Sequence, residues 1–360
     1  MKVVVPLTII SLILSILIGL SFAKGGGIVK QDAEDPVSAN MIDRSHIGEK
    51  HYTIGISLDT LKEQRWQIDK AAMEARAKEL GIELVIQTAN SDDTRQVQDV
   101  QGLITRNVDL IIIVPHNGTA MTKAVNEAKA AGIPVIAYDR LIQDCDLDLY
   151  ITFNNFKVGE VQAQYLIDKI GGKGNIIRIY GSPVDNNAKT FKEGQDSVLK
   201  PYIERGDIKV VHEDWATNWD PAQATKITNA AITKVRDNFD GILASNDGTA
   251  QGAIQALKAE GYAGKKIVTG QDAELVALQR ILGGTQSMTI YKPLKKLATA
   301  AIDCAVDILN GKIIASDGTV NNGKIDVPAK YSDVIAVDKD NIDMVIDEGM
   351  FTREQVYGKE

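Results

Sequence analysis

The sequence predicts an α/β protein in which short parallel strands alternate with helices and form two sheets. In one segment, apolar runs at Leu110–Val114 and Pro134–Tyr138 flank a stretch of helical composition that stops at Gly132. Such runs are typical of strands buried on both faces, and parallel strands need a crossover helix between them. The same alternation repeats along most of the chain. The roughly 310 residues that follow the N-terminal region exceed what one hydrophobic core usually serves, so we expect two domains.

The expected strands follow from the apolar runs, and the expected helices follow from the segments between them. Several of these helices end at glycines such as Gly81 and Gly171. The expected strands are Tyr52–Leu58, Glu83–Gln87, Leu110–Val114, Pro134–Tyr138, Tyr150–Phe153, Asn175–Tyr180, Ile208–His212, Gly241–Ala244, Ile267–Gly270 and Ser287–Tyr291. The expected helices are Arg65–Leu80, Thr94–Arg106, the segment before Gly132, Lys157–Ile170, Ala188–Leu199, Pro221–Asn238, Ala250–Glu260, Glu274–Leu282 and Leu294–Asn310. After Gly311 the pattern loosens, and only a short helix at Asp343–Glu348 is expected.

Composition excludes several classes of protein. The net charge of −8 argues against a nucleic-acid partner, because phosphate binding needs a basic face. Two cysteines, Cys145 and Cys304, provide no disulfide framework. Cys304 lies on an apolar helical stripe with Leu297, Ala301 and Ile308, which indicates a buried, inert thiol.

The N-terminal segment predicts an extracytoplasmic protein. Lys2 precedes an uncharged stretch, Val3–Ala23, and Ser21-Phe22-Ala23 resembles a signal-peptidase site. The stretch is also long enough to cross a bilayer, so residues 1–23 are either a signal peptide or a retained membrane anchor. No cysteine stands near residue 23, which argues against a lipoprotein signal. Residues 24–50 are polar and aperiodic and are expected to be a linker.

Polar side chains gather just past the ends of the expected strands, where ligands of parallel sheets bind. The residues at these positions are Arg65, Trp66, Asp139, Arg140, Asp185, Asn186, Asn187, Trp215, Trp219, Asn246, Asp247, Gln271, Asp272 and Lys292. Carboxylates, amides and cations can satisfy hydroxyls that both donate and accept, and an aromatic ring can cover the apolar face of a sugar. The alternatives are a surface ion pair for Asp139 with Arg140, and helix caps, which we favour for Asn186 and Asp247.

Enzymatic signatures are absent from the sequence. It contains no G-x-G-x-x-G after the first strand, no phosphate-binding P-loop and no G-x-S-x-G elbow. Its four histidines have no metal-ligand spacing, so neither a metal nor another cofactor is expected. A glycosidase would need one carboxyl group protonated near neutral pH, whereas Arg140 beside Asp139 favours the ionised form. We therefore expect a binding protein and not an enzyme.

The strand-end motifs resemble those of the periplasmic sugar-binding proteins of bacterial ABC importers, in the D-xylose-binding branch. The resemblance runs from about Tyr52 to the last residues. The motifs that carry it are Gln64-Arg65-Trp66-Gln67, Ala137-Tyr138-Asp139-Arg140, Gly181-Ser182-Pro183-Val184-Asp185-Asn186-Asn187-Ala188, Ser245-Asn246-Asp247, Gly270-Gln271-Asp272-Ala273 and Met288-Thr289-Ile290-Tyr291-Lys292-Pro293. One departure lies after the first crossing, where the family tends to read Phe-Asp-Asn-Glu and this chain reads Phe153-Asn154-Asn155-Phe156.

This resemblance implies the type I periplasmic binding protein fold, with two doubly wound lobes, three crossings between them and a sugar in the cleft. The N-terminal lobe would comprise residues 51–153 plus about 292–320, and the C-terminal lobe residues 154–291 plus about 321–360. The residues that would bond the sugar are Arg65, Asp139, Arg140, Asp185, Asn187, Asn246, Asp272 and Lys292. Trp66 and Trp219 would form its apolar walls. D-xylose as the ligand follows from the resemblance alone.

Two partners remain open at this point. The protein delivers sugar to the membrane permease of an importer, or it is an anchored receptor that reports xylose to a sensor histidine kinase. The fold also occurs in DNA-binding repressors, but an apolar segment occupies the N-terminus, where their helix-turn-helix would be.

Overall fold

The computed structural model describes residues 51–358. The predictions of a signal peptide or anchor and of a linker fall on residues 1–50, outside the described residues. No helix within residues 51–358 is long and apolar enough to span a membrane. Both cysteines lie in the described part, and both are free and buried, as expected for Cys304.

The N-terminal lobe is built on a seven-stranded sheet. Its strands are β1 (Thr53–Leu58), β2 (Glu83–Thr88), β3 (Leu110–Ile113), β4 (Val135–Tyr138), β5 (Leu149–Phe153), β11 (Gly318–Asn321) and β12 (Asp326–Ser332). They stand in the order β11-β12-β5-β4-β3-β1-β2. All neighbouring strands are parallel except β11 and β12.

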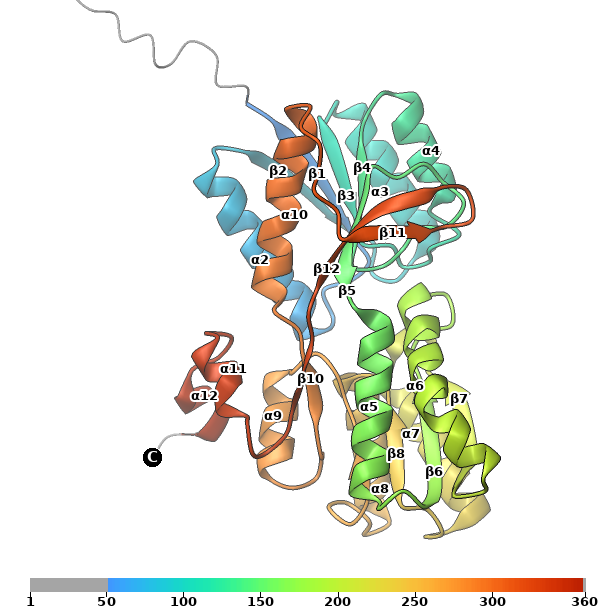
Figure 1. Cartoon of the computed structure of the whole chain (residues 1–360). Coiled ribbons are helices and arrows are strands. Elements are labelled where there is room, and N and C mark those ends of the chain that lie inside the picture. The colour runs from blue at the N-terminus through green and yellow to red at the C-terminus, as the bar shows by residue number, and fades with distance from the viewer. Residues whose placement is uncertain (1–50, 359–360) are drawn as a thin grey trace, which may run out of the picture. The chain divides into compact units, whose positions relative to one another are not determined.

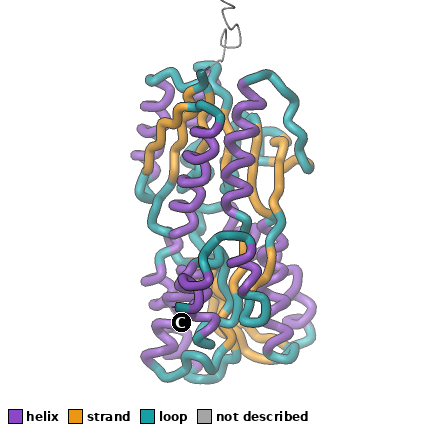
Figure 2. Tube along the Cα trace, turned by 90° about the vertical axis from the view of Figure 1, so that its left-hand side faces the viewer, coloured by secondary structure: helices purple, strands orange, loops and turns teal. Residues whose placement is uncertain are grey.

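Helices cover both faces of this sheet, because successive residues of its central strands point to opposite sides. Helices α2 (Gln64–Glu79) and α10 (Leu294–Leu309) lie side by side on one face, over Leu110 and Ile112 of β3 (Figures 1 and 2). Helices α3 (Asp93–Thr105) and α4 (Thr122–Ala130) cover the other face, which carries the intervening residues of β3. The sheet is therefore doubly wound, as predicted.

The C-terminal lobe repeats this plan on a parallel four-stranded sheet in the order β7-β6-β8-β9. The strands are β6 (Gly174–Tyr180), β7 (Ile208–Trp215), β8 (Gly241–Ala244) and β9 (Ile267–Val268). Helices α5 (Asn155–Lys169) and α6 (Asn186–Glu204) cover one face, and α7 (Pro221–Val235) and α8 (Asp247–Ala259) cover the other. A 3-10 turn, η2 (Thr217–Trp219), and helix α9 (Leu275–Leu282) complete the strand-end connections.

Three segments cross between the lobes. The first leads from β5 into α5, and the second from β10 (Thr289–Tyr291) into α10. The third leads from β12 to β13 (Ile335–Val337), which pairs antiparallel with β10. The chain then ends in α11 (Asp343–Asp347) and α12 (Arg353–Tyr357), which pack against α9.

The last crossing lies later than the expected boundary near residue 320. Strand β12 pairs with β5, from Ala329 opposite Tyr150 to Ser332 opposite Phe153, and therefore belongs to the N-terminal lobe. The boundary was misplaced because β11 and β12 contain polar residues and a proline, Pro328, which hide an edge hairpin from the sequence pattern.

Two other elements extend beyond their expected ends. Strand β7 continues past His212 to Trp215, because it is an edge strand with one partner, β6, and tolerates polar residues. Trp215 is therefore part of the strand and not of the loop after it. Helix α6 continues past Leu199 to Glu204 and includes Pro201, whose missing N–H removes one hydrogen bond of the helix.

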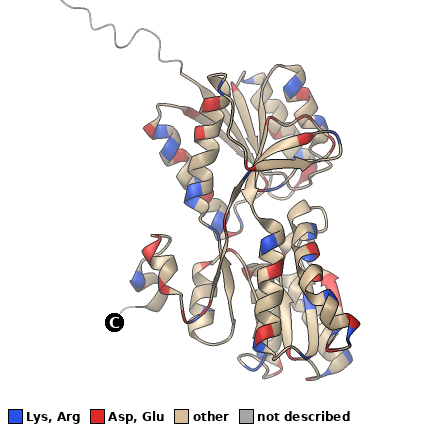
Figure 3. Ribbon diagram, in the orientation of Figure 1, with Lys and Arg blue, Asp and Glu red and all other residues tan. Residues whose placement is uncertain are grey.

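Acidic and basic residues are interspersed on the helices of both lobes (Figure 3). On α2, for example, Lys70 pairs with Glu74 and Arg76 pairs with Glu79 along the exposed face. These surface pairs contribute little to stability, in contrast to the buried charges between the lobes.

Candidate functional site

One cavity between the lobes is lined by the predicted site residues. The space between its lining atoms amounts to about 330 Å³, part of which is open to solvent. All ten residues expected from the sequence line it: Arg65, Trp66, Asp139, Arg140, Asp185, Asn187, Trp219, Asn246, Asp272 and Lys292. Glu63, Phe191 and Gln271 line it as well. The strand ends converge here because the carboxyl ends of parallel strands share one edge of each sheet.

Arg65 is fixed within the N-terminal lobe. At the start of α2, its Nη2 donates to Asp139 Oδ2 at 2.8 Å and to Asp69 Oδ2 at 3.2 Å. Asp69 is in turn held by the hydroxyl of Tyr138, which donates to its Oδ1 at 2.7 Å. The guanidinium stacks on the ring of Trp66, 4.0 Å from the centroid. These contacts orient the N–H donors of Arg65 before any ligand binds.

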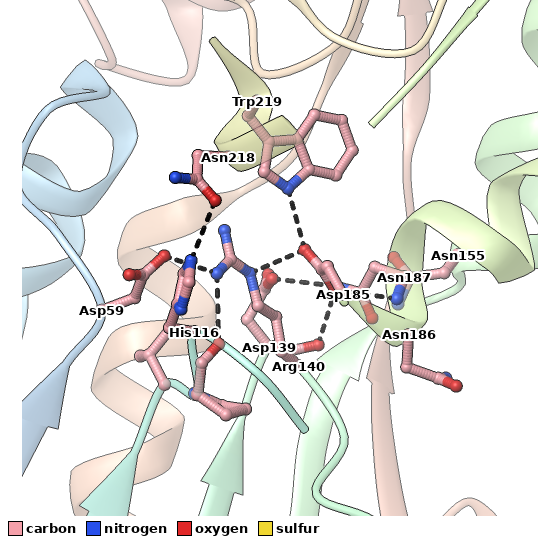
Figure 4. A network of polar contacts seen from close by, with 12 residues as sticks. Asp59, His116, Asp139, Arg140, Asn155, Asp185, Asn186, Asn187, Asn218 and Trp219 are labelled. Atoms are coloured by element: carbon pink, nitrogen blue, oxygen red, sulfur yellow. Dashed lines mark hydrogen bonds and ion pairs between the residues drawn. The ribbon is translucent and has the colours of Figure 1, made fainter. Parts of the chain in front are cut away.

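Arg140 connects the two lobes (Figure 4). Its Nη1 donates to Asp59 Oδ2 at 2.7 Å and to the carbonyl of Pro115 at 3.1 Å, both in the N-terminal lobe. Its Nε lies 2.8 Å from Asp185 Oδ2 of the C-terminal lobe. Asp139 and Arg140 are only 2% and 6% exposed, so the alternative of a surface ion pair is wrong.

Asp185 and Asn187 begin α6 and face the N-terminal lobe. Asp185 is the N-cap of α6, since its Oδ1 accepts the Asn187 amide at 2.9 Å, and its Oδ2 accepts the indole Nε1 of Trp219 at 3.0 Å. The Asn187 Nδ2 donates to both the carbonyl and the Oδ1 of Asp139, at 3.0 Å each. This helix start therefore supplies several contacts to the opposite lobe, two from Asn187 to Asp139 and one from Asp185 to Arg140.

The capping residues were misassigned by one position. We favoured Asn186 and Asp247 as helix caps, but the caps are Asp185 and Asn246. Asn246 forms a capping box with Thr249, which fixes its side chain at the cavity. Asp247 is fully buried behind it and accepts from Glu274 N, Gln286 Nε2 and Thr289 Oγ1. In this chain, capping and lining the cavity are roles of the same residues.

Asp272 and Lys292 close the cavity on the hinge side. The Asp272 Oδ1 lies 2.7 Å from Lys292 Nζ and 3.6 Å from Arg65 Nη1. These contacts are ion pairs without hydrogen-bond geometry, so this buried oxygen has no hydrogen-bond partner. Glu63 Oε2 and Gln271 Oε1 are likewise buried acceptors without a hydrogen-bond partner. Buried acceptors of this kind require donors, which the hydroxyl groups of a bound polyol supply.

Aromatic rings form the apolar part of the lining. Trp66 comes from the N-terminal lobe, and Trp219 packs edge-on against Phe191 in the C-terminal lobe, with ring centroids 6.2 Å apart. Gly181 is required beside this pair, because a Cβ at that position would lie 2.0 Å from Trp219 Cη2. The combination of flat rings and hydrogen-bonding groups suits a sugar ring with its apolar faces and polar rim.

Burial and charge act differently on the carboxyl groups of the site. Burial would raise the pKa of Asp139, but the positive charges of Arg65, Lys292 and Arg140 hold this pKa below its ordinary value. For Asp69, burial outweighs Arg65 and raises the pKa to about 6. Burial also raises the pKa of Glu63 and that of Asp185. The Asp139 carboxyl group is therefore ionised at neutral pH and acts as a hydrogen-bond acceptor.

Three lining residues were not selected from the sequence as sugar contacts. Gln271 was noted among the polar residues past the strand ends, in the same motif as Asp272, but was not selected. Glu63 precedes α2 by one residue and carries no strand-end signal. Phe191 lies within α6, and only the packing of that helix brings it to the cavity.

Comparison with known proteins assigns the family. Residues 54–313 match the model described as periplasmic binding protein domain. The chain belongs to the periplasmic binding protein family. This assignment confirms the resemblance inferred from the strand-end motifs.

The relatives of this periplasmic binding protein include sugar-binding proteins. A D-xylose-binding periplasmic protein of Escherichia coli is 46% identical over 308 residues, which cover 85% of this chain and 93% of the relative. One from Haemophilus influenzae is 44% identical and covers 89% of this chain and 97% of the relative. Among solved structures, a carbohydrate transporter solute binding protein from Chloroflexus aurantiacus in complex with D-glucose is 36% identical, with a TM-score of 0.80. This match covers 85% of this chain and 98% of that chain.

Proposed function

We propose that this protein binds D-xylose, or a closely similar aldose, outside the cytoplasm. The observation that carries the proposal is the cavity between the lobes in which cations, carboxylates, amides and aromatic rings from both lobes converge. The names of the two relatives at 44% and 46% identity support xylose as the sugar. In this proposal Arg65, Asp139, Arg140, Asp185, Asn187, Asn246, Asp272 and Lys292 bond the hydroxyls, and Trp66 and Trp219 cover the apolar faces.

Titration calorimetry tests this proposal. D-xylose, D-glucose and D-ribose are titrated separately into the protein at neutral pH. The expected result is one binding site per chain with D-xylose as the tightest ligand. Absence of heat with all three sugars contradicts the function, and a preference for D-glucose or D-ribose corrects the ligand.

The partner follows from the family and from the N-terminal segment. We propose delivery to the membrane permease of an ABC importer as the main function. A second candidate, an anchored receptor that signals to a sensor histidine kinase, is favoured by the length of the apolar segment Val3–Ala23, about 30 Å as a helix and enough for the hydrocarbon core.

N-terminal sequencing of the native protein separates the two candidates. A chain that begins at Met1 or Lys2 and sediments with membranes supports the anchored receptor. A chain that begins at Lys24 in the soluble extracytoplasmic fraction rules out the anchor and leaves the importer.

A further inference from the structure

The lobes are also joined directly by side chains that do not line the cavity. His116 follows β3 in the N-terminal lobe, and Asn218 lies in η2 of the C-terminal lobe. His116 Nε2 and Asn218 Oδ1 are 3.1 Å apart (Figure 4). A second side-chain bond between the lobes joins Gln143 Nε2 to Asn186 Oδ1 at 3.2 Å. These contacts exist only while the lobes are together.

The imidazole of His116 is held in place by its own lobe. Its Nδ1 lies 2.7 Å from Asp93 Oδ1, and Asp93 Oδ2 accepts the side-chain amide of Asn117 at 3.0 Å. The His116 backbone N–H donates to Gln96 Oε1 at 2.8 Å, and the side chain is 11% exposed. Because these partners all belong to the N-terminal lobe, they orient the imidazole ring toward the C-terminal lobe before the two lobes meet.

Asn218 is positioned by an unusual backbone conformation. Its φ is +55°, and that of the next residue, Trp219, is +56°, in the left-handed region that L residues rarely adopt. Trp219 lines the cavity and donates to Asp185. Strained backbone of this kind persists where the surrounding structure demands it and often marks a functional position. The same turn therefore carries both Asn218, whose amide contacts His116, and Trp219, whose ring lines the cavity.

The two side chains have complementary hydrogen-bonding groups. The Asp93 carboxylate only accepts, so Nδ1 carries a hydrogen. Nε2 then faces the Asn218 side-chain amide, which contains an acceptor oxygen and a donor NH₂ group.

We propose that His116 and Asn218 form a latch that slows release of the bound sugar by stabilising the closed arrangement of the lobes. This inference rests on the proposed sugar-binding function and assigns these two residues no contact with the ligand. A bond made only after closure affects dissociation, because the lobes must part before the sugar leaves. Association depends on the open form and is left unchanged.

The test compares release rates in the full-length protein. Asn218→Gly removes the amide and suits the positive φ. His116→Ala removes the ring, and the double variant combines both. Asn107→Gly is the matched control, since Asn107 also has a positive φ, +54°, but lies exposed in the turn after α3. Stopped-flow tryptophan fluorescence with D-xylose gives the association and dissociation rate constants.

The expected result is a dissociation rate constant about three- to tenfold higher in each single variant, the scale of one ordinary hydrogen bond, with the association rate constant unchanged. The double variant should be no faster than the singles, because both remove the same bond. Wild-type release from Asn218→Gly and His116→Ala, or additive effects in the double variant, would overturn the latch while leaving sugar binding in place. If the wild-type protein gives no response to any sugar, the proposed function fails and the latch fails with it.

Discussion

The two lobes supply the cavity with different kinds of groups. The N-terminal lobe contributes charges that are already neutralised within it: Arg65 by Asp69 and Asp139, and Arg140 by Asp59. In the C-terminal lobe, Asp185 finds its cationic partner, Arg140, across the cleft. Asp272 pairs with Lys292 at the second crossing and, at longer range, with Arg65 of the other lobe.

This difference indicates a division of labour. The N-terminal half of the site is organised before closure, because its ion pairs do not depend on the other lobe. The C-terminal half gains charge partners when the lobes meet. Changes in the N-terminal half should therefore affect folding stability most, and changes in the C-terminal half should affect ligand binding most.

The largest effect is expected from Arg65→Met. Arg65 is only 4% exposed, and removing its guanidinium leaves Asp69, Asp139 and Asp272 without their shared cation. Breaking a buried ion network by removing one partner typically lowers the free energy of unfolding by about 3–5 kcal/mol. Urea denaturation at neutral pH measures the loss. Arg76→Met is the control on the same helix, and its exposed ion pairs predict a nearly unchanged stability. Equal free energies of unfolding for Arg65→Met and Arg76→Met would contradict the expected difference between the buried and the exposed ion pairs.

Asp272→Asn should weaken binding more than folding. The carboxylate is replaced by an amide of nearly the same shape, and one buried acceptor of a charge-assisted hydrogen bond is lost. We expect D-xylose affinity to fall by about 1.5–3 kcal/mol. Calorimetry measures the affinity, with the exposed Asp237→Asn as the control in the same lobe. If Asp272→Asn binds xylose as the wild type does, Asp272 is not a sugar contact.

The next effect concerns how folding stability depends on pH, and it again differs between the two lobes. Whereas the pKa of Asp139 is lowered by its cations, burial and the negative charges of Asp247 and Asp272 raise the pKa of Glu274 to about 8. A carboxyl group with a raised pKa stabilises the fold at low pH, and this contribution is lost as the pH rises through about 8.

Glu274→Gln should therefore reduce the fall in unfolding free energy between pH 5 and pH 8.5 by at least about 1 kcal/mol, since each unit of raised pKa corresponds to about 1.4 kcal/mol. Thermal or urea denaturation across this range provides the measurement, with the exposed Glu193→Gln as the control that keeps the wild-type slope. A pH profile of Glu274→Gln identical to that of the wild type would contradict the burial argument.

The sequence predicted the sheet cores well because both faces of the central strands are covered. Apolar runs such as Leu110–Val114 can be read locally as strands, and the strand ends then bring Asp139 and Asp272 to a shared edge. Edge elements could not be recognised in this way. Strand β11 is short and largely exposed, and β12 contains Pro328, so only their pairing with each other and with β5 defines them.

The site shows the same limit at a finer scale. Residues within motifs could be selected by type, but Phe191 reaches the cavity through helix packing, and Glu63 through the approach of the chain to α2. The contact between His116 and Asn218 depends on the arrangement of the two lobes, which no local pattern encodes.

Small-angle X-ray scattering with and without saturating D-xylose tests most directly the claim that the two halves of the site come together around the sugar. Periplasmic binding proteins as a class close by hinge motion around their ligands. The account predicts a smaller radius of gyration with D-xylose and no change with a sugar that fails to bind in calorimetry. Superimposable profiles with and without D-xylose, under conditions where calorimetry shows full occupancy, would contradict it.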